Sequence, residues 1–339
     1  MSMAQFIQDA WNRKAGWLLL LRPLSWVYGA VFRINKLLYQ SGIKQTYTAP
    51  VPVMVIGNIT IGGSGKTPLI IQLVKYLQQH HVKVAVISRG YGGKGPFPAL
   101  VDENSVPQQV GDEPTLIVQR TKVPMAVGAD RQKAIELLLQ HHQVDIILSD
   151  DGLQHWALQR QIEWVVLDSQ RGLGNERLLP EGFLREPKSR LQQCTVIEHT
   201  YQSNRLLSMH LRLGKPYLLH SDNNTHHSFD FNHKFHVVVG IGFPQRFYQS
   251  LIELGIDASR QICHEFPDHY TYTLNDLSFD DTHPLITTEK DAVKIKSLIA
   301  QHPHLLTSDI WVLPVDAVLS DDCYAVLQQQ LQQLKVSIH

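Results

Sequence analysis

Residues 51–68 place an apolar, β-branched run before a glycine-rich turn and end with Gly65-Lys66-Thr67 at the start of a helix-prone stretch. This is the Walker A order of strand, phosphate loop and helix. Glycines allow the backbone to turn several N–H groups toward one anion, and the positive end of the next helix adds to the attraction. Lys66 can then reach the outer phosphates of a nucleoside triphosphate, and the Thr67 hydroxyl can bind Mg²⁺. The predicted phosphate loop consists of Thr60, Ile61, Gly62, Gly63, Ser64, Gly65, Lys66 and Thr67.

The loop departs from the usual pattern at one position. A glycine normally stands five residues before Gly65, where this chain has Thr60, and the nearest earlier glycine is Gly57. A glycine-rich turn that binds nothing is the simpler interpretation, but the strand before it and the helix after it favour phosphate binding.

A second apolar run, residues 144–148, leads through Ser149 to the adjacent carboxylates Asp150 and Asp151. An aspartate at the end of a strand is where P-loop enzymes hold their metal ion. Two neighbouring carboxylates repel each other, so a nearby cation would help to keep both ionised. The alternative is a polar strand exit followed by a turn at Gly152, because Asp-Gly favours turns. Together with the phosphate loop, the metal-binding interpretation is the stronger one.

Residues 111–114, Gly-Asp-Glu-Pro, form a second acidic element, which we expect in a loop. Pro114 should hold Glu113 in an extended backbone. A loop carboxylate can accept a proton from a substrate hydroxyl, although a solvated turn explains these residues equally well.

His269 stands in the segment Phe-Pro-Asp-His-Tyr of the C-terminal part of the chain. A lone histidine is usually structural, but beside an acidic loop it could be the partner of a general base. The nearby residues 288–291, Thr-Glu-Lys-Asp, are typical of a capping box that starts a helix.

Strand-like and helical runs alternate along most of the chain. The first strands are expected at 51–56, 82–88, 123–127, 144–148 and 162–167, with helices at 67–79 and 130–141. This alternation indicates an α/β fold of the P-loop NTPase type, with a parallel sheet covered by helices on both faces. Right-handed crossovers would bring the carboxyl ends of the strands to one edge, where ligands bind.

The pattern loosens around residues 200–235, and a second α/β set follows. We therefore expect three parts. These are an N-terminal membrane-associating helical segment (1–40), a P-loop kinase-like core (41–214) and a smaller C-terminal α/β domain (215–339) that contributes His269.

Composition narrows the function classes. Lysine plus arginine and aspartate plus glutamate both number 31, so the net charge is zero and nothing global predicts a nucleic-acid partner. The three cysteines are far apart in the sequence, which favours a reducing compartment. The paired histidines are expected at the surface rather than on a metal.

The N-terminal residues 11–39 are rich in leucine, tryptophan and basic side chains, but Arg22-Pro23 interrupts the apolar run. A membrane-spanning helix and a cleaved signal peptide are therefore not expected. The mixture suits one helix, or two helices broken at Pro23, lying in a membrane interface. An amphipathic helix packed on the protein's own core is the alternative.

Considered together, these segments resemble a known family. Eight blocks occur in the same order as in the tetraacyldisaccharide 4'-kinases, the lipid A 4'-kinases of Gram-negative bacteria: VIGNITIGGSGKTP, SRGYGG, VGDEP, GADR, DDGLQHW, LREP, FPDHY and TEKDAVK. The match runs from the basic, apolar N-terminus to about residue 295, and the displaced glycine of the phosphate loop is shared by the family.

The resemblance implies transfer of the ATP γ-phosphate to the 4'-hydroxyl of a tetraacylated glucosamine disaccharide 1-phosphate, the lipid A precursor. It implies ATP and Mg²⁺ as cofactors and a peripheral location on the cytoplasmic face of the inner membrane. In this resemblance, Asp112 is the base toward the sugar hydroxyl and is assisted by His269. Lys66 neutralises the transferred phosphoryl group, and the metal is held by Thr67, Asp150 and Asp151. Further positions matching residues that line the site are Glu113, Arg131, Gln154, His155, Arg185 and Glu186.

Two other functions share part of this pattern. A P-loop ATPase or GTPase that acts as a switch or metallochaperone would hydrolyse nucleotide alone, whereas a kinase needs its acceptor. A non-enzymatic peripheral membrane protein that uses nucleotide as a structural ligand would tolerate the loss of Asp112.

Overall fold

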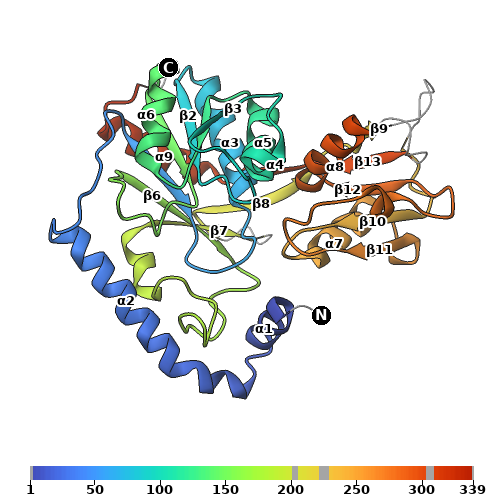
Figure 1. Cartoon of the computed structure of the whole chain (residues 1–339), viewed down its shortest axis with the longest axis horizontal. Coiled ribbons are helices and arrows are strands. Elements are labelled where there is room, and N and C mark those ends of the chain that lie inside the picture. The colour runs from blue at the N-terminus through green and yellow to red at the C-terminus, as the bar shows by residue number, and fades with distance from the viewer. Residues whose placement is uncertain (1–2, 201–204, 221–228, 303–308, 338–339) are drawn as a thin grey trace.

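The computed structural model describes residues 3–200, 205–220, 229–302 and 309–337. Two sheets with their covering helices lie side by side, and the N-terminal helices run along the lower side of the part that holds the larger sheet (Figure 1). The central strands of the larger sheet are apolar in sequence because they are buried on both faces.

Within the described residues, the larger sheet has nine strands in the order β14-β8-β7-β6-β1-β5-β2-β4-β3. Its strands are β1 (Val53–Gly57), β2 (Val84–Ser88), β3 (Ala99–Val101), β4 (Met125–Val127), β5 (Ile146–Asp150), β6 (Ile162–Asp168), β7 (Thr195–His199), β8 (Ser208–Leu213) and β14 (Val315–Leu319). All neighbours pair in parallel except β3 with β4 and β14 with β8. The predicted parallel sheet is therefore confirmed, with an antiparallel strand at each edge.

Helices cover both faces of this sheet, as the sequence predicts. One face packs against α3 (Lys66–Gln79), α5 (Asp112–Thr121) and α9 (Asp321–Gln333), and the other packs against α6 (Arg131–His141) and the N-terminal segment. A short helix, α4 (Pro107–Val110), precedes α5. In α3, Leu69, Leu73 and Leu77 are buried at helical spacing, which fixes the helix behind the phosphate loop.

The smaller sheet has the order β11-β10-β12-β13-β9. Its strands are β9 (Tyr217–His220), β10 (Phe235–Val239), β11 (Gln261–Glu265), β12 (Leu285–Thr288) and β13 (Ile310–Leu313). Helix α7 (Pro244–Leu254) covers one face and α8 (Glu289–Gln301) the other.

The predicted C-terminal domain of residues 215–339 is wrong at its end. After β13 the chain returns to the larger sheet, where β14 pairs with β8 and α9 packs beside α3. The two chain segments that connect the sheets lie side by side. The Gly214 N–H, just after β8, donates to the Pro314 carbonyl, just before β14, at 2.9 Å. Local sequence patterns could not reveal this return, because the partners of β14 lie about a hundred residues earlier in the chain.

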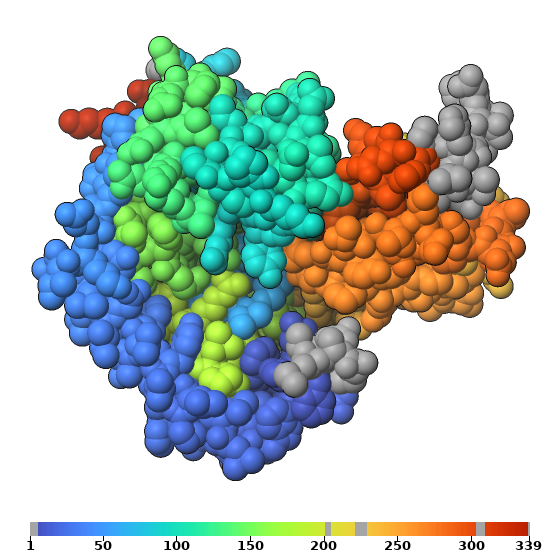
Figure 2. Space-filling model, viewed as in Figure 1, coloured from blue at the N-terminus to red at the C-terminus, as the bar shows by residue number. Residues whose placement is uncertain are grey.

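The N-terminal segment comprises α1 (Met3–Asn12), a 3₁₀ helix η1 (Gly16–Leu21) and α2 (Arg22–Gln40). Of the two arrangements considered, a helix broken at Pro23 is not found, because Pro23 lies in the first turn of α2, where its missing N–H costs little. The chain instead turns between α1 and η1. In Figure 2 these helices, in blue, form the lower edge of the molecule.

Candidate active site

The predicted phosphate loop connects β1 to α3. Gly62 and Gly65 have φ values of 101° and 91°, a backbone region that glycine adopts readily. The outside of the loop is held by two contacts. The Ile61 N–H donates to the Phe183 carbonyl at 2.9 Å, and the Asn58 side-chain amide donates to Ser64 Oγ at 3.0 Å. The loop is thus preformed, with the N-terminal end of α3 directly behind it.

The two carboxylates at the end of β5 lie beside this loop, because β5 pairs with β1 and Asp150 is opposite Ile56. Lys66 Nζ lies 3.5 Å from Asp151 Oδ1, and Arg185 Nη1 lies 2.9 Å from Asp151 Oδ2. Burial favours the neutral form of Asp151, but Lys66 and Arg185 outweigh it, so its pKa lies below the usual value. The structure therefore groups Lys66, Asp150, Asp151 and Arg185.

Asp150 is suited to a metal ion. It is almost completely buried, and in the part of the chain that the structure describes its Oδ1 has no hydrogen-bond partner. Burial raises the pKa of Asp150 to about 7, with the charge of Glu113 adding to the effect. A cation at this oxygen would favour the ionised form.

The donor set near Asp150 fits Mg²⁺. This ion prefers oxygen ligands and is usually bound by one or two carboxylates together with phosphates and water. Across the described ranges no cluster of three or more His, Cys, Asp or Glu is arranged as a metal site. Asp150, Asp151 and the Thr67 hydroxyl would therefore hold the ion in company with nucleotide phosphates.

The acidic element at residues 111–114 is not the expected loop. Gly111 has a φ of 101° and is followed directly by α5, so Glu113 is helical rather than extended. Pro114 falls in the first helical turn, where it is tolerated, and carboxylates are favourable at this end of a helix. The Asp112 side chain is only 4% exposed.

His269 lies directly against Asp112. Its Nδ1 is 3.1 and 3.0 Å from the two carboxylate oxygens of Asp112. Burial is the largest single influence and opposes charge on both groups, but their hydrogen bond and the nearby opposite charges together outweigh it, with Lys290 contributing at Asp112 and Asp268 at His269. The pKa of Asp112 is therefore lowered and that of His269 raised. The structure thus joins a carboxylate from α5 to a histidine from the turn that follows β11.

Lys290 is a site residue that the sequence analysis missed. Its Nζ lies 3.0 Å from Glu113 Oε1, 3.1 Å from Asp268 Oδ1 and 3.3 Å from His269 Nε2. The expected capping role of Thr288 is correct, because its hydroxyl accepts the Asp291 N–H at 3.1 Å. No local signal marks Lys290, since Glu113 precedes it by 177 positions.

Gln154 and the buried Glu186 form a hydrogen-bonded pair behind the phosphate loop. Gln154 Nε2 donates to Glu186 Oε1 at 2.6 Å and approaches the Asn58 carbonyl at 3.4 Å. Glu186 also accepts from Arg190 Nε at 3.1 Å, and burial raises the pKa of Glu186. These residues support the loop from behind.

Arg131 donates to backbone carbonyls, at 2.6 Å to Gly128 and 3.3 Å to Asp150. Burial lowers its pKa to about 10. His155 is neutral, because burial and the charge of Arg131 lower its pKa to about 4. Arg131 thus ties the ends of β4 and β5 together beneath the carboxylates.

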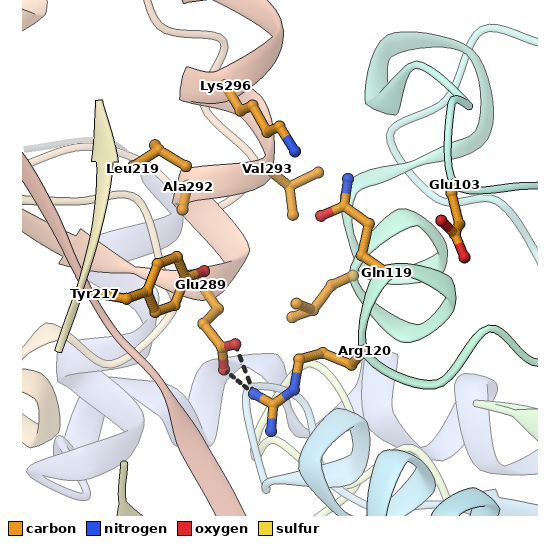
Figure 3. A pocket seen from close by; sticks show the side chains of 10 residues that line it. Glu103, Gln119, Arg120, Tyr217, Leu219, Glu289, Ala292, Val293 and Lys296 are labelled. Atoms are coloured by element: carbon orange, nitrogen blue, oxygen red, sulfur yellow. Dashed lines mark hydrogen bonds and ion pairs between the residues drawn. The ribbon is translucent and has the colours of Figure 1, made fainter. Parts of the chain in front are cut away.

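A cavity of about 310 Å³ lies away from these groups, between α5, α8 and β9 (Figure 3). Arg120, in the last turn of α5, binds Glu289 at the start of α8 with Nη1–oxygen distances of 2.5 and 2.6 Å. Arg120 also pairs with Asp316 of β14. This ion network connects the larger and smaller sheets with their helices, close to the segments that join them. None of the predicted site residues lines the cavity.

A pH effect on stability is expected from His199, which is buried in β7 and whose Nδ1 is 3.2 Å from the Ser64 carbonyl. Burial and the charge of Arg246 lower its pKa to about 4. The unfolded chain, with a histidine pKa near 6.5, takes up the proton first, so stability is complete above pH 6.5 and decreases toward pH 4. Between pH 7 and 5 we expect a loss on the order of 2 kcal/mol from this residue.

Urea unfolding of the wild type and of His199→Asn at both pH values checks this. Asparagine retains a donor for the Ser64 carbonyl but does not titrate, so its stability should depend less on pH. An unchanged pH dependence in the variant would contradict the assignment.

The comparisons with known proteins agree with this geometry. The family profile described as Tetraacyldisaccharide-1-P 4'-kinase matches residues 17–332. A tetraacyldisaccharide 4'-kinase of Psychrobacter cryohalolentis is 48% identical over 100% of this chain and 99% of its own length. A tetraacyldisaccharide 4'-kinase of Ectopseudomonas mendocina is 41% identical over 98% of this chain and 99% of its own length.

A solved structure is also similar. The "apo" form of LpxK from Aquifex aeolicus, crystallised in complex with ATP, superposes with a TM-score of 0.72 at 25% identity, covering 94% of this chain and 99% of that one. The chain therefore belongs to the tetraacyldisaccharide 4'-kinase family.

Proposed function

We propose a residue-level route by which this chain carries out the reaction of its family. The chain is an ATP-dependent kinase of lipid A biosynthesis, and it phosphorylates the 4'-hydroxyl of a tetraacylated glucosamine disaccharide 1-phosphate. The observation that carries the route is the 3.0 Å contact between His269 Nδ1 and Asp112 Oδ2. This family membership argues against a nucleotide-dependent switch and against a non-enzymatic membrane protein.

Asp112 acts as the general base of the proposed route. Its lowered pKa keeps the carboxylate ionised near neutral pH, so it can accept the proton of the 4'-hydroxyl. His269 donates its Nδ1–H to Asp112 and fixes the orientation of the carboxylate. Lys290 binds Glu113 and Asp268 on either side of this pair and holds α8 against α5.

Charge neutralisation dominates the other half of the site. Bound Mg²⁺ would neutralise the phosphates of ATP, with Thr67, Asp150 and Asp151 as its protein ligands. Lys66 supplies a positive charge for the transferred phosphoryl group, and Arg185 orients Asp151. Phosphoryl transfer needs mainly this positioning and electrostatic stabilisation.

The test is transfer of radiolabel from γ-labelled ATP to a monophosphorylated disaccharide lipid precursor. Label should appear in the lipid only when acceptor, ATP and Mg²⁺ are all present. Nucleotide hydrolysis that proceeds equally well without the acceptor would contradict the proposed route.

The membrane is the second part of the proposal. By length and composition alone, residues 16–40 could cross a bilayer, because they contain an 18-residue window with a mean hydropathy of 1.2. One side of α2, however, packs on the protein. Ser25 Oγ donates to the Leu178 carbonyl at 3.0 Å, and Tyr28 donates to the Arg185 carbonyl at 2.9 Å.

The opposite side of α2 and η1 is apolar and exposed at helical spacing. Leu20, Leu24, Val27, Val31 and Ile34 are each more than half exposed. Small and polar residues thus face the protein, and large apolar residues face outward. An amphipathic helix of this kind is suited to the membrane interface, and we place it on the cytoplasmic face, where ATP meets the acylated acceptor.

Replacing Leu20, Leu24 and Val27 with serine should weaken vesicle binding about tenfold or more, because three apolar side chains no longer enter the bilayer. The apparent KM for the lipid acceptor should rise more than that for ATP. Sedimentation with phosphatidylethanolamine–phosphatidylglycerol vesicles measures the first effect. Leu206→Ser, an exposed leucine elsewhere, is the control. Unchanged sedimentation of the triple variant would rule out the interfacial helix.

A further inference from the structure

An arginine that the sequence analysis did not select lies against the phosphate loop. A Cβ atom built on Gly62 would come within 2.5 Å of Arg171 Nη1, so the guanidinium is in van der Waals contact with the loop. Gly62 is the third of the eight loop residues from Thr60 to Thr67. Arg171 comes from the segment after β6, a direct neighbour of β1 in the sheet.

The position of Arg171 is built into the fold. Asp168, at the end of β6, is buried, and its Oδ1 accepts the N–H groups of Gln170 and Arg171 at 3.0 and 3.3 Å. The guanidinium also lies over the ring of Phe183, 5.1 Å from its centroid. Phe183 in turn accepts the Ile61 N–H of the phosphate loop. Backbone and side chain are therefore both held toward the loop.

Arg171 feels the charge of its neighbour Asp168 but makes no close ion pair with it. The other oxygen of Asp168 pairs with Arg246 of α7. Among the residues that the structure describes, no carboxylate oxygen lies within 4.0 Å of the Arg171 guanidinium. Burial lowers its pKa, but arginine stays charged at neutral pH. Two arginines thus share one carboxylate beside a loop shaped for an anion.

We propose that Arg171 is a phosphate-binding residue, which contacts the outer phosphates of ATP and stabilises the charge that develops during transfer. A guanidinium that stabilises the transition state can be supplied by the same chain in P-loop enzymes. Arg171 would act beside Lys66, which is already 3.5 Å from Asp151. The inference rests on the ATP-dependent reaction of the proposed function and adds a residue to it.

The experiment compares Arg171→Met with Arg171→Lys. Methionine retains apolar packing on Phe183 without the charge, and lysine retains the charge without the planar fork. Arg177→Ala, at an exposed arginine of the same segment, is the matched control. Binding of a non-hydrolysable ATP analogue and of ADP is measured by calorimetry, and kcat by label transfer.

Arg171→Met should lose about 10- to 100-fold in affinity for the triphosphate analogue, as expected for one charge-assisted contact, and clearly less for ADP. The kcat value should fall about 30-fold, and Arg171→Lys should recover part of both losses. Equal losses for the two nucleotides in a folded variant, or none, would overturn the proposal. If lipid phosphorylation failed in the wild type while this discrimination persisted, the proposed function would be wrong but Arg171 would remain a phosphate ligand.

Discussion

Lys66→Ala is expected to lower kcat on the order of 10²–10³-fold or more, nearly abolishing label transfer to the lipid. Lys66 is the lysine of the phosphate loop, and its ammonium lies beside the strand-end carboxylate of Asp151 at 3.5 Å. Its charge is needed most when negative charge moves between the phosphates. The loss should therefore fall on kcat more than on the KM for the lipid.

The control for this variant is Lys75→Ala. Lys75 is on the same helix, and its ammonium lies 3.4 Å from Asp316 Oδ1, away from the loop. This partly exposed ion pair lies far from the reacting groups, so Lys75→Ala should retain nearly full activity. Both variants should unfold at wild-type temperatures. Activity of Lys66→Ala within tenfold of wild type would contradict the role of the lysine.

The phosphate-loop half of the site could be predicted from the sequence because its elements follow one another directly along the chain. Strand, loop and helix follow one another within residues 53–79, and the carboxylates end a strand that is clearly apolar. Local pattern therefore predicted β1, α3 and β5 to within two residues. The same reasoning is wrong at Glu113, because Gly111 starts a helix there and Pro114 is tolerated in its first turn.

The other half of the site, around Asp112 and His269, depends on packing between residues that are distant in the sequence. Lys290 reaches Glu113 only because α8 crosses α5, and β14 returns to the larger sheet from the far end of the chain. No periodic pattern in the sequence predicts the role of Arg171, because a backbone turn at Asp168 directs its side chain toward the loop. Contacts between residues so distant in sequence are set by topology, and a single sequence contains no local record of them.

The second large effect concerns the base. Asp112 and His269 are 157 positions apart and meet with Nδ1–oxygen distances of 3.1 and 3.0 Å. If His269 orients the carboxylate that accepts the hydroxyl proton, Asp112→Ala should cost on the order of 10²–10⁴-fold in kcat. His269→Ala should cost less, because the carboxylate remains near Lys290. His233→Ala, at an exposed histidine of the smaller domain, should leave kcat unchanged.

The double variant decides between a shared and a separate role. Residues that act as one unit are strongly non-additive, so Asp112→Ala with His269→Ala should be barely slower than Asp112→Ala alone. Affinity for ATP should change little in all three, since neither residue belongs to the phosphate loop. Fully additive losses in kcat would show two independent functions. A large loss of ATP affinity in Asp112→Ala would instead place this carboxylate on the metal side of the site, next to Asp150, whose pKa already responds to the neighbouring Glu113.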